Sequence, residues 1–225
     1  MFTVTVISFA PVSRWKTTNR EPRMIFAEEF QALNDTVYYW SVYDPAMKCD
    51  VGSTALRTSG GLVVIDPIPL AETAWDDLLA RAPLRAVLLT NGNHARHAAA
   101  LREKYQVPVV TAAATRKDLA EVKPDVLLLE NEMVYGIAAI PVPGATAGET
   151  AFYFRTAATL VLGDAVINVD PEKGLEFLPD KYCADPAQNR ASLRKLLSLD
   201  FNAVTFAHGL PLTTRAREKW AALLA

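Results

Sequence analysis

The stretch Leu89-Thr-Asn-Gly-Asn-His-Ala-Arg-His97 holds two of the three histidines in this chain of 225 residues. It overlaps the end of an apolar run at residues 86–90, which predicts a β-strand, and it leads into a helical pattern at residues 94–105. A strand that ends in polar residues delivers them to the edge of its sheet, where open α/β folds commonly build sites. We therefore expect this stretch to form a functional loop.

Three further apolar runs end in the same way. The run at residues 159–163 leads to Asp164, the run at residues 203–206 leads to His208, and the run at residues 62–65 ends at Asp66. Histidine nitrogen and carboxylate oxygen are the ligands that zinc and iron sites use. The sequence therefore offers a candidate metal site, with His94, His97, Asp164 and His208 as its ligands.

Composition narrows the possible functions. Hydrophobic residues make up 51% of the chain and the formal net charge is −2, so no field favours nucleic acid or an anionic membrane surface as a partner. The two cysteines, Cys49 and Cys183, form no disulfide framework, which leads us to expect free thiols and a cytoplasmic location. No stretch reaches the roughly 18 apolar residues of a membrane helix.

The chain is expected to form one domain with a short arm. Residues 1–23 are predicted to be an N-terminal arm and residues 24–225 the domain, with Met24 as an alternative start to Met1. Early strands are predicted as hairpins and later ones alternate with helices, which favours an α/β (α+β) fold of two mixed sheets with helices outside. Besides the helix at residues 94–105, we expect a long polar loop at residues 170–185.

Four segments, in this order, resemble the metallo-β-lactamase superfamily: Gly61-Leu-Val-Val-Ile-Asp66, then Leu89 to His97 as quoted above, then Pro143-Gly-Ala-Thr-Ala-Gly148, then Leu162-Gly-Asp164 with Phe206-Ala-His-Gly209. The resemblance covers the chain from about residue 35 to the C-terminus. It implies a four-layer αββα sandwich with metal held at one sheet edge. It also implies hydrolysis of ester, amide, thioester or phosphoester bonds by a metal-activated water.

The loop departs from the superfamily pattern Thr-His-x-His-x-Asp-His. Aligned without a gap, which is the simpler register, Asn91 and Asn93 stand at the first two histidine positions, and Ala95 and Arg96 replace the Asp and the last His. A slip of one residue places Gly92, His94, Arg96 and His97 at those positions instead.

Elsewhere the match is partial. Ala145 stands where the superfamily has a histidine, whereas Asp164 and His208 match its bridging Asp and its late His. The resemblance then implies one ion of zinc or iron at most, and the alternative is that no metal is bound.

Arg96 separates two hypotheses, because a guanidinium cannot ligate a metal. Either Arg96 lies on the solvent face of its helix, or it forms a bidentate pair with Asp164 in place of the ion. Asp66 is expected to hold the loop by hydrogen bonds, and Asn91 and Asn93 either line the site or form a turn. Phe177 either lines a pocket or pins its loop to the body.

The first hypothesis is a metal-dependent hydrolase of unknown substrate with a reduced site, in which Asp164, His208 and Arg96 take part in catalysis. The alternative is a non-catalytic member that binds a small molecule or a partner, with the Arg96–Asp164 pair replacing metal. The first hypothesis expects a small-molecule substrate, the alternative expects a small-molecule ligand or a partner, and both are compatible with a homodimer. β-Lactam hydrolysis does not follow, because one fold hosts many reactions.

Overall fold

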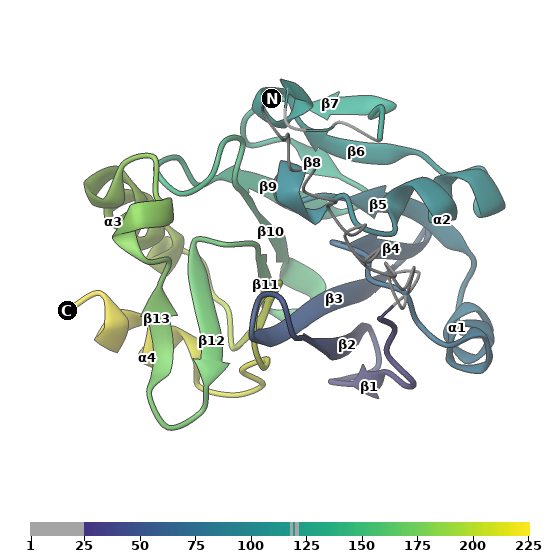
Figure 1. Cartoon of the computed structure of the whole chain (residues 1–225), viewed down its shortest axis with the longest axis horizontal. Coiled ribbons are helices and arrows are strands. Elements are labelled where there is room, and N and C mark those ends of the chain that lie inside the picture. Colours follow the sequence, from purple (N-terminus) through teal and green to yellow (C-terminus); the bar gives the residue numbers. More distant parts are fainter. Residues whose placement is uncertain (1–24, 118, 120–121) are drawn as a thin grey trace, which may run out of the picture.

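Two β-sheets packed face to face form the centre of the protein, and helices cover both outer faces (Figure 1). The computed structural model describes residues 25–117, 119 and 122–225, so the arm expected at residues 1–23 lies outside the described residues, as does Met24. Helices α1 (Glu72–Leu79) and α2 (Ala98–Tyr105) cover one side, and α3 (Pro186–Lys195) and α4 (Ala216–Leu223) cover the other. The predicted αββα sandwich of two mixed sheets is confirmed.

The first sheet begins with antiparallel hairpins and continues with parallel strands. The chain crosses between parallel strands through α1 and α2, because such a connection needs a segment long enough to span the sheet. Its seven strands, in spatial order, are β1 (Gln31–Ala32), β2 (Val37–Asp44), β3 (Cys49–Thr58), β4 (Gly61–Ile65), β5 (Leu84–Leu88), β6 (Val109–Ala112) and β7 (Val126–Leu128).

The second sheet pairs its strands antiparallel except for β11 and β14, which run parallel. Its spatial order is β14 (Ala203–Phe206), β11 (Thr159–Leu162), β10 (Thr150–Phe154), β9 (Ile137–Pro141) and β8 (Met133–Val134). A separate hairpin joins β12 (Val166–Asp170) to β13 (Gly174–Phe177). Short 3₁₀ turns lie between these elements, namely η1 (Gly92–His94), η2 (Ala113–Lys117), η3 (Arg155–Ala157), η4 (Asp180–Tyr182) and η5 (Leu196–Ser198).

Alternation along the strands produces three apolar layers. On β4, Val63 and Ile65 face the second sheet, whereas Leu62 and Val64 pack against α1 and α2. On β10, Phe152 and Phe154 face the first sheet, and the other face of this sheet packs against α3 and α4. Because successive side chains of a strand point to opposite faces, strands buried on both sides are apolar throughout.

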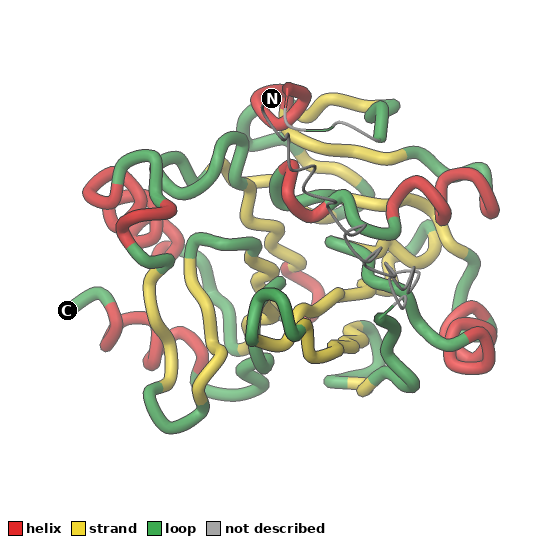
Figure 2. Tube along the Cα trace, in the orientation of Figure 1, coloured by secondary structure: helices red, strands yellow, loops and turns green. Residues whose placement is uncertain are grey.

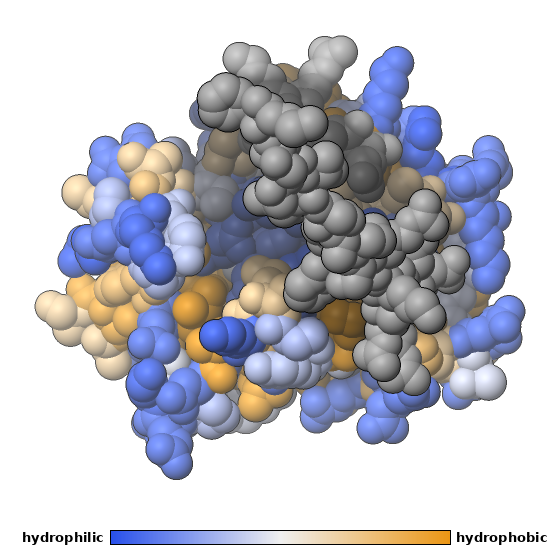
Figure 3. Space-filling view, in the orientation of Figure 1, coloured by the Kyte–Doolittle hydropathy of each residue, from blue (hydrophilic) through white to orange (hydrophobic). Residues whose placement is uncertain are grey.

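Two expectations about local structure are wrong. The helix predicted at residues 94–105 is split into η1 and α2, because Arg96 adopts a left-handed backbone conformation with φ 34°. The loop predicted at residues 170–185 contains the strand β13, drawn in yellow in Figure 2, and the 3₁₀ turn η4. The tip of the β12–β13 hairpin is hydrophilic, and the surface above it is apolar (Figure 3). Because the tip residues are polar, the pattern predicted a loop and not the strand that follows.

Among the described residues, no helix combines the length and the apolarity that crossing a bilayer requires.

Candidate metal centre

The carboxyl ends of four strands meet at one edge of the sandwich. β4 and β5 are parallel neighbours in the first sheet, and β11 and β14 are parallel neighbours in the second. Asp66 directly follows β4, whereas His94 ends η1, the turn after β5. Asp164 and His208 each stand two residues beyond the end of β11 and β14. Parallel pairing therefore brings together four polar side chains that are far apart in the sequence.

Three of these side chains converge on one point. Asp164 Oδ1 lies 3.1 Å from His94 Nε2 and 3.1 Å from His208 Nε2, and the two Nε2 atoms are 3.3 Å apart. His94 is 1% exposed, and Asp164 and His208 are each 7% exposed. Ligands about 2.0–2.1 Å from a tetrahedral zinc ion lie about 3.3 Å from one another, so this triangle fits such an ion. The three residues form a candidate metal site.

Asp66 fixes the orientation of His94. Its Oδ1 accepts the Thr90 N–H at 2.8 Å, and its Oδ2 accepts the Thr90 hydroxyl at 2.6 Å and faces His94 Nδ1 at 3.0 Å. This contact assigns the proton to Nδ1 and leaves Nε2 as the nitrogen that faces the site. The predicted role of Asp66 in holding the loop agrees with this geometry.

The charges of the site act strongly on one another. Burial lowers the pKa of His94, but the carboxylates of Asp66 and Asp164 outweigh it and raise that pKa to about 9. Burial alone would raise the pKa of Asp164, yet the two imidazoles hold it well below its usual range. Burial also lowers the pKa of His208. Binding of a cation at Nε2 of His94 must therefore displace a proton.

The turn that carries His208 is held from the first sheet. The Tyr39 hydroxyl donates to the Gly209 carbonyl at 2.6 Å, and Cys49 Sγ lies 3.8 Å from His208 Nδ1. Gly209 has φ 92°, a conformation that a residue with a side chain adopts only under strain. His208 thus has a weak thiol partner behind it, whereas His94 has a carboxylate.

Arg96 does not form the predicted pair with Asp164. Its guanidinium instead donates to the carbonyl of Gly52 at 3.0 Å and to those of Asp66 and Ala207, each at 3.5 Å. The hypothesis that Arg96 replaces the ion is therefore wrong in its geometry, and the side chain does not point to solvent either. It links β3 to the turns that carry Asp66 and His208.

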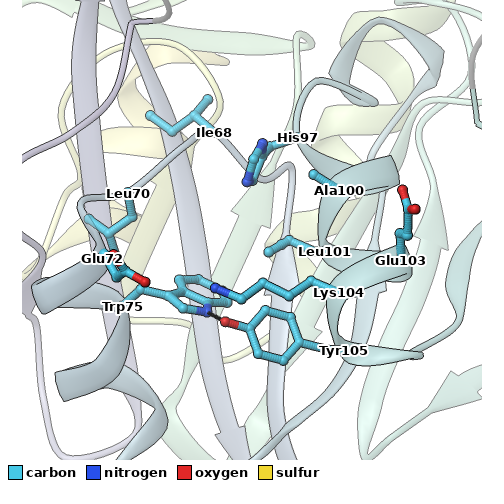
Figure 4. A pocket seen from close by; sticks show the side chains of 10 residues that line it. All are labelled: Ile68, Leu70, Glu72, Trp75, His97, Ala100, Leu101, Glu103, Lys104 and Tyr105. Carbon is cyan, nitrogen blue, oxygen red and sulfur yellow. Dashed lines mark hydrogen bonds between the residues drawn. The ribbon is translucent and has the colours of Figure 1, made fainter.

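His97 lies outside the triangle of ligand atoms. Its ring lines a cavity of about 560 Å³ between α1 and α2, with Ile68 near it and the hydrogen-bonded Trp75–Tyr105 pair at the far end (Figure 4). The prediction that His97 is a ligand beside His94 is not met, because the left-handed Arg96 turns the chain between them. His97 is thus no ligand in this arrangement.

The remaining predicted site residues lie at different distances from the triangle of ligand atoms. Asn91 is buried beside the triangle, and its amide nitrogen lies 3.1 Å from Asp164 Oδ2. Asn93 is exposed and lines a cavity of about 320 Å³ together with Ala145 and Lys181. Phe177 packs on the core under α3 and α4, with the Arg190 guanidinium 5.1 Å from its ring centre, so it pins its hairpin to the body.

Glu149 belongs to the site although the sequence did not single it out. Its carboxylate accepts hydrogen bonds from the Asn91 amide at 2.7 Å and from the Asp164 N–H at 2.9 Å. Burial and the neighbouring charge of Asp164 raise its pKa to about 7. The available signal was its place directly before the apolar run at residues 150–154, where a charged residue is drawn into the interior.

Comparison with known proteins agrees with this architecture. The sequence model of the metallo-beta-lactamase superfamily matches residues 31–223. The chain belongs to the metallo-β-lactamase superfamily. No curated protein matches it significantly in sequence. Within the superfamily pattern, the gap-free register would leave His94 outside the ligand positions, but the structure brings it to Asp164 and His208.

Solved structures of other proteins share the fold. A metallo-beta-lactamase from Pontibacter korlensis superposes with a TM-score of 0.70 at 19% identity, over 87% of this chain and 98% of that one. One from Erythrobacter litoralis gives 0.66 at 15% identity, over 87% and 95%. The protein TTHA1623 in a di-iron-bound form gives 0.58 at 27% identity, over 76% and 93%.

Proposed function

We propose that this superfamily member is a metal-dependent hydrolase of a small molecule, with a one-ion centre formed by His94, Asp164 and His208. The observation that carries the proposal is the triangle of ligand atoms with sides of 3.1, 3.1 and 3.3 Å. A donor set of two imidazoles and one carboxylate suits zinc or iron. Iron also has a precedent in the di-iron form of TTHA1623.

The residues around the triangle prepare it for that ion. A divalent ion bound there would supply Lewis acidity and a water activated near neutral pH. Asp66 holds the proton of His94 on Nδ1, and Arg96 ties together the turns that carry Asp66 and His208. The cavity lined by Asn93, Thr146 and Lys181 adjoins η1 and is our candidate for the substrate pocket.

The alternative is a metal-holding protein that binds its ligand without cleaving it. The burial of all three ligand side chains, at 1%, 7% and 7% exposure, favours this alternative. Catalytic zinc sites keep one position open to water or substrate, whereas structural sites are closed.

The test compares wild type with Asp164→Ala, purified without chelator or affinity-column metal. We expect elemental mass spectrometry to find about one equivalent of zinc or iron in wild type and none in the variant. Ester, thioester and phosphoester substrates should be hydrolysed by wild type only. A wild-type chain that takes up no metal even from excess zinc overturns the proposal, and so does a variant that keeps its metal. Metal without hydrolysis supports the alternative.

A further inference from the structure

The two carboxylate oxygens of Asp164 have different partners. Oδ1 faces the imidazoles of His94 and His208, each at 3.1 Å. Oδ2 accepts a hydrogen bond from the Asn91 amide nitrogen at 3.1 Å. The orientation of that amide is fixed from its other end, because Asn91 Oδ1 accepts the Asn93 N–H at 2.9 Å and caps η1. An N–H group, not an acceptor, therefore lies against Oδ2.

Glu149 connects this amide with the backbone of the Asp164 turn. Its Oε2 accepts the Asn91 amide and the Thr146 hydroxyl, both at 2.7 Å. Its Oε1 accepts the N–H of Asp164 at 2.9 Å and that of Ala165 at 3.4 Å. Glu149 is 3% exposed, so it binds four donors from three chain segments in the interior.

Gly163 makes this close approach possible. A Cβ atom at this position would clash with Thr90 Oγ1 and would lie 2.7 Å from Glu149 Oε1. The turn before Asp164 thus leaves room for the Glu149 carboxylate and for no side chain of its own. The arrangement of Glu149 around the turn is built into the packing of the site.

We propose that Glu149 is a positioning residue that, with Asn91, holds Asp164 in a one-oxygen binding mode and limits the centre to a single ion. The inference rests on the proposed metal centre. A second ion beside Oδ2 would have to displace the Asn91 N–H, and the partial positive charge of that group repels a cation. Glu149 keeps the N–H in place, since its Oε2 accepts from the same nitrogen.

The first experiment changes the number of ions. Asn91→Asp replaces the N–H donor by an oxygen, so three carboxylates would face one another, a donor set that suits hard ions such as Mn²⁺. We expect equilibrium dialysis against manganese chloride to give one equivalent for wild type and two for Asn91→Asp. The control Asn34→Asp makes the same change of charge at an exposed turn and should stay at one equivalent.

The second experiment changes the affinity for the first ion. Loss of an outer-shell partner typically weakens metal binding by about 10–100-fold, which we expect for zinc and Glu149→Ala. Glu149→Gln should lose less, because its remaining oxygen still accepts the Asp164 N–H. The control Asp125→Asn alters a carboxylate that accepts the Val109 N–H at 2.9 Å, far from the centre. It should lower the thermal midpoint without changing the zinc Kd.

The outcomes separate this inference from the proposed function. One equivalent of manganese in Asn91→Asp, together with wild-type zinc affinity in the Glu149 variants, overturns the inference and leaves the metal centre intact. A wild-type chain that binds no ion overturns both. If Glu149→Ala fails to fold, Asn91→Asp and Glu149→Gln decide the matter.

Discussion

The segment after β5 and the turns after β11 and β14 reach the same metal centre by different routes. Asp164 and His208 follow their strands by two residues, and each projects directly into the site. The segment at residues 90–97 instead forms a 3₁₀ turn and a left-handed residue, so that His94 enters the site and His97 leaves it. Residues next to a strand end inherit their direction from the sheet, whereas residues farther along depend on local backbone conformation.

The two histidines of the centre are also supported differently. Asp66 lies 3.0 Å from His94 Nδ1, whereas the partner of His208 Nδ1 is the Cys49 thiol at 3.8 Å. A charged acceptor at the shorter distance orients an imidazole far more strongly than a thiol does. The segment at residues 90–97 therefore carries the more firmly fixed ligand, His94. The following substitutions test this difference between the two histidines.

The largest effect should separate two histidines that are three residues apart. His94→Ala removes a ligand and should weaken zinc binding by more than the roughly 10–100-fold of an outer-shell loss. His97→Ala changes a side chain in the α1–α2 cavity and should leave the zinc Kd within about 2-fold, because no ligand is lost. Isothermal titration with zinc measures both, with circular dichroism to verify folding. Equal effects of the two substitutions would contradict the split helix.

A smaller effect is expected when the support of His94 is weakened. Asp66 has φ 52°, a left-handed conformation that asparagine also tolerates, so Asp66→Asn should preserve the backbone. The neutral amide is a poorer acceptor for His94 Nδ1–H, and zinc affinity should fall by about 10–100-fold. Cys49→Ser, the matching change behind His208, should have a smaller effect on the same titration. The reverse order would show that His208 is the more dependent ligand.

The smallest effect on metal binding is expected for Arg96, because its hydrogen bonds connect backbone segments and it does not contact the ion. Arg96→Met removes three hydrogen bonds, but the Asp66 carbonyl keeps its bond from Ser53 and the Ala207 carbonyl keeps its bond from Gly52. We expect the free energy of unfolding to fall by about 1–3 kcal/mol in urea titration. Metal content should be unchanged.

Arg102→Met provides the control for Arg96→Met. It breaks an exposed ion pair with Asp125 and should cost about 1 kcal/mol or less. Loss of metal in Arg96→Met at unchanged stability would point instead to a direct role of Arg96 at the centre.

Features whose physical cause lies within a short stretch of sequence were predictable, and features that depend on distant contacts were not. Strands such as β4, β5 and β11 were predictable, because burial on both faces demands continuous apolar runs. The helix at residues 94–105 was predicted too long, since no pattern in the sequence marks Arg96 as left-handed. The β12–β13 hairpin was missed in part because its strands are short and only half buried.

The residues of the metal centre also fall into those that the sequence predicted and those that it did not. Asp66, His94, Asp164 and His208 were all proposed from their places after apolar runs, and the structure brings these four together. Glu149 was missed, since its partners Asn91 and Asp164 lie 58 and 15 residues away from it in the sequence. The prediction of an Arg96–Asp164 pair was wrong, because the guanidinium of Arg96 donates its hydrogen bonds to backbone carbonyls of three other segments.

The sequence by itself determined the sandwich and the strand ends that carry polar residues, because apolar runs and the residues that end them are local features of the chain. Only the tertiary structure decided which of those residues meet. The pairing of β4 with β5 and of β11 with β14 sets the triangle of His94, Asp164 and His208. The left-handed Arg96 excludes His97, and the space beside Gly163 admits Glu149. Contacts between distant segments depend on the packing of both sheets, and no local pattern encodes them.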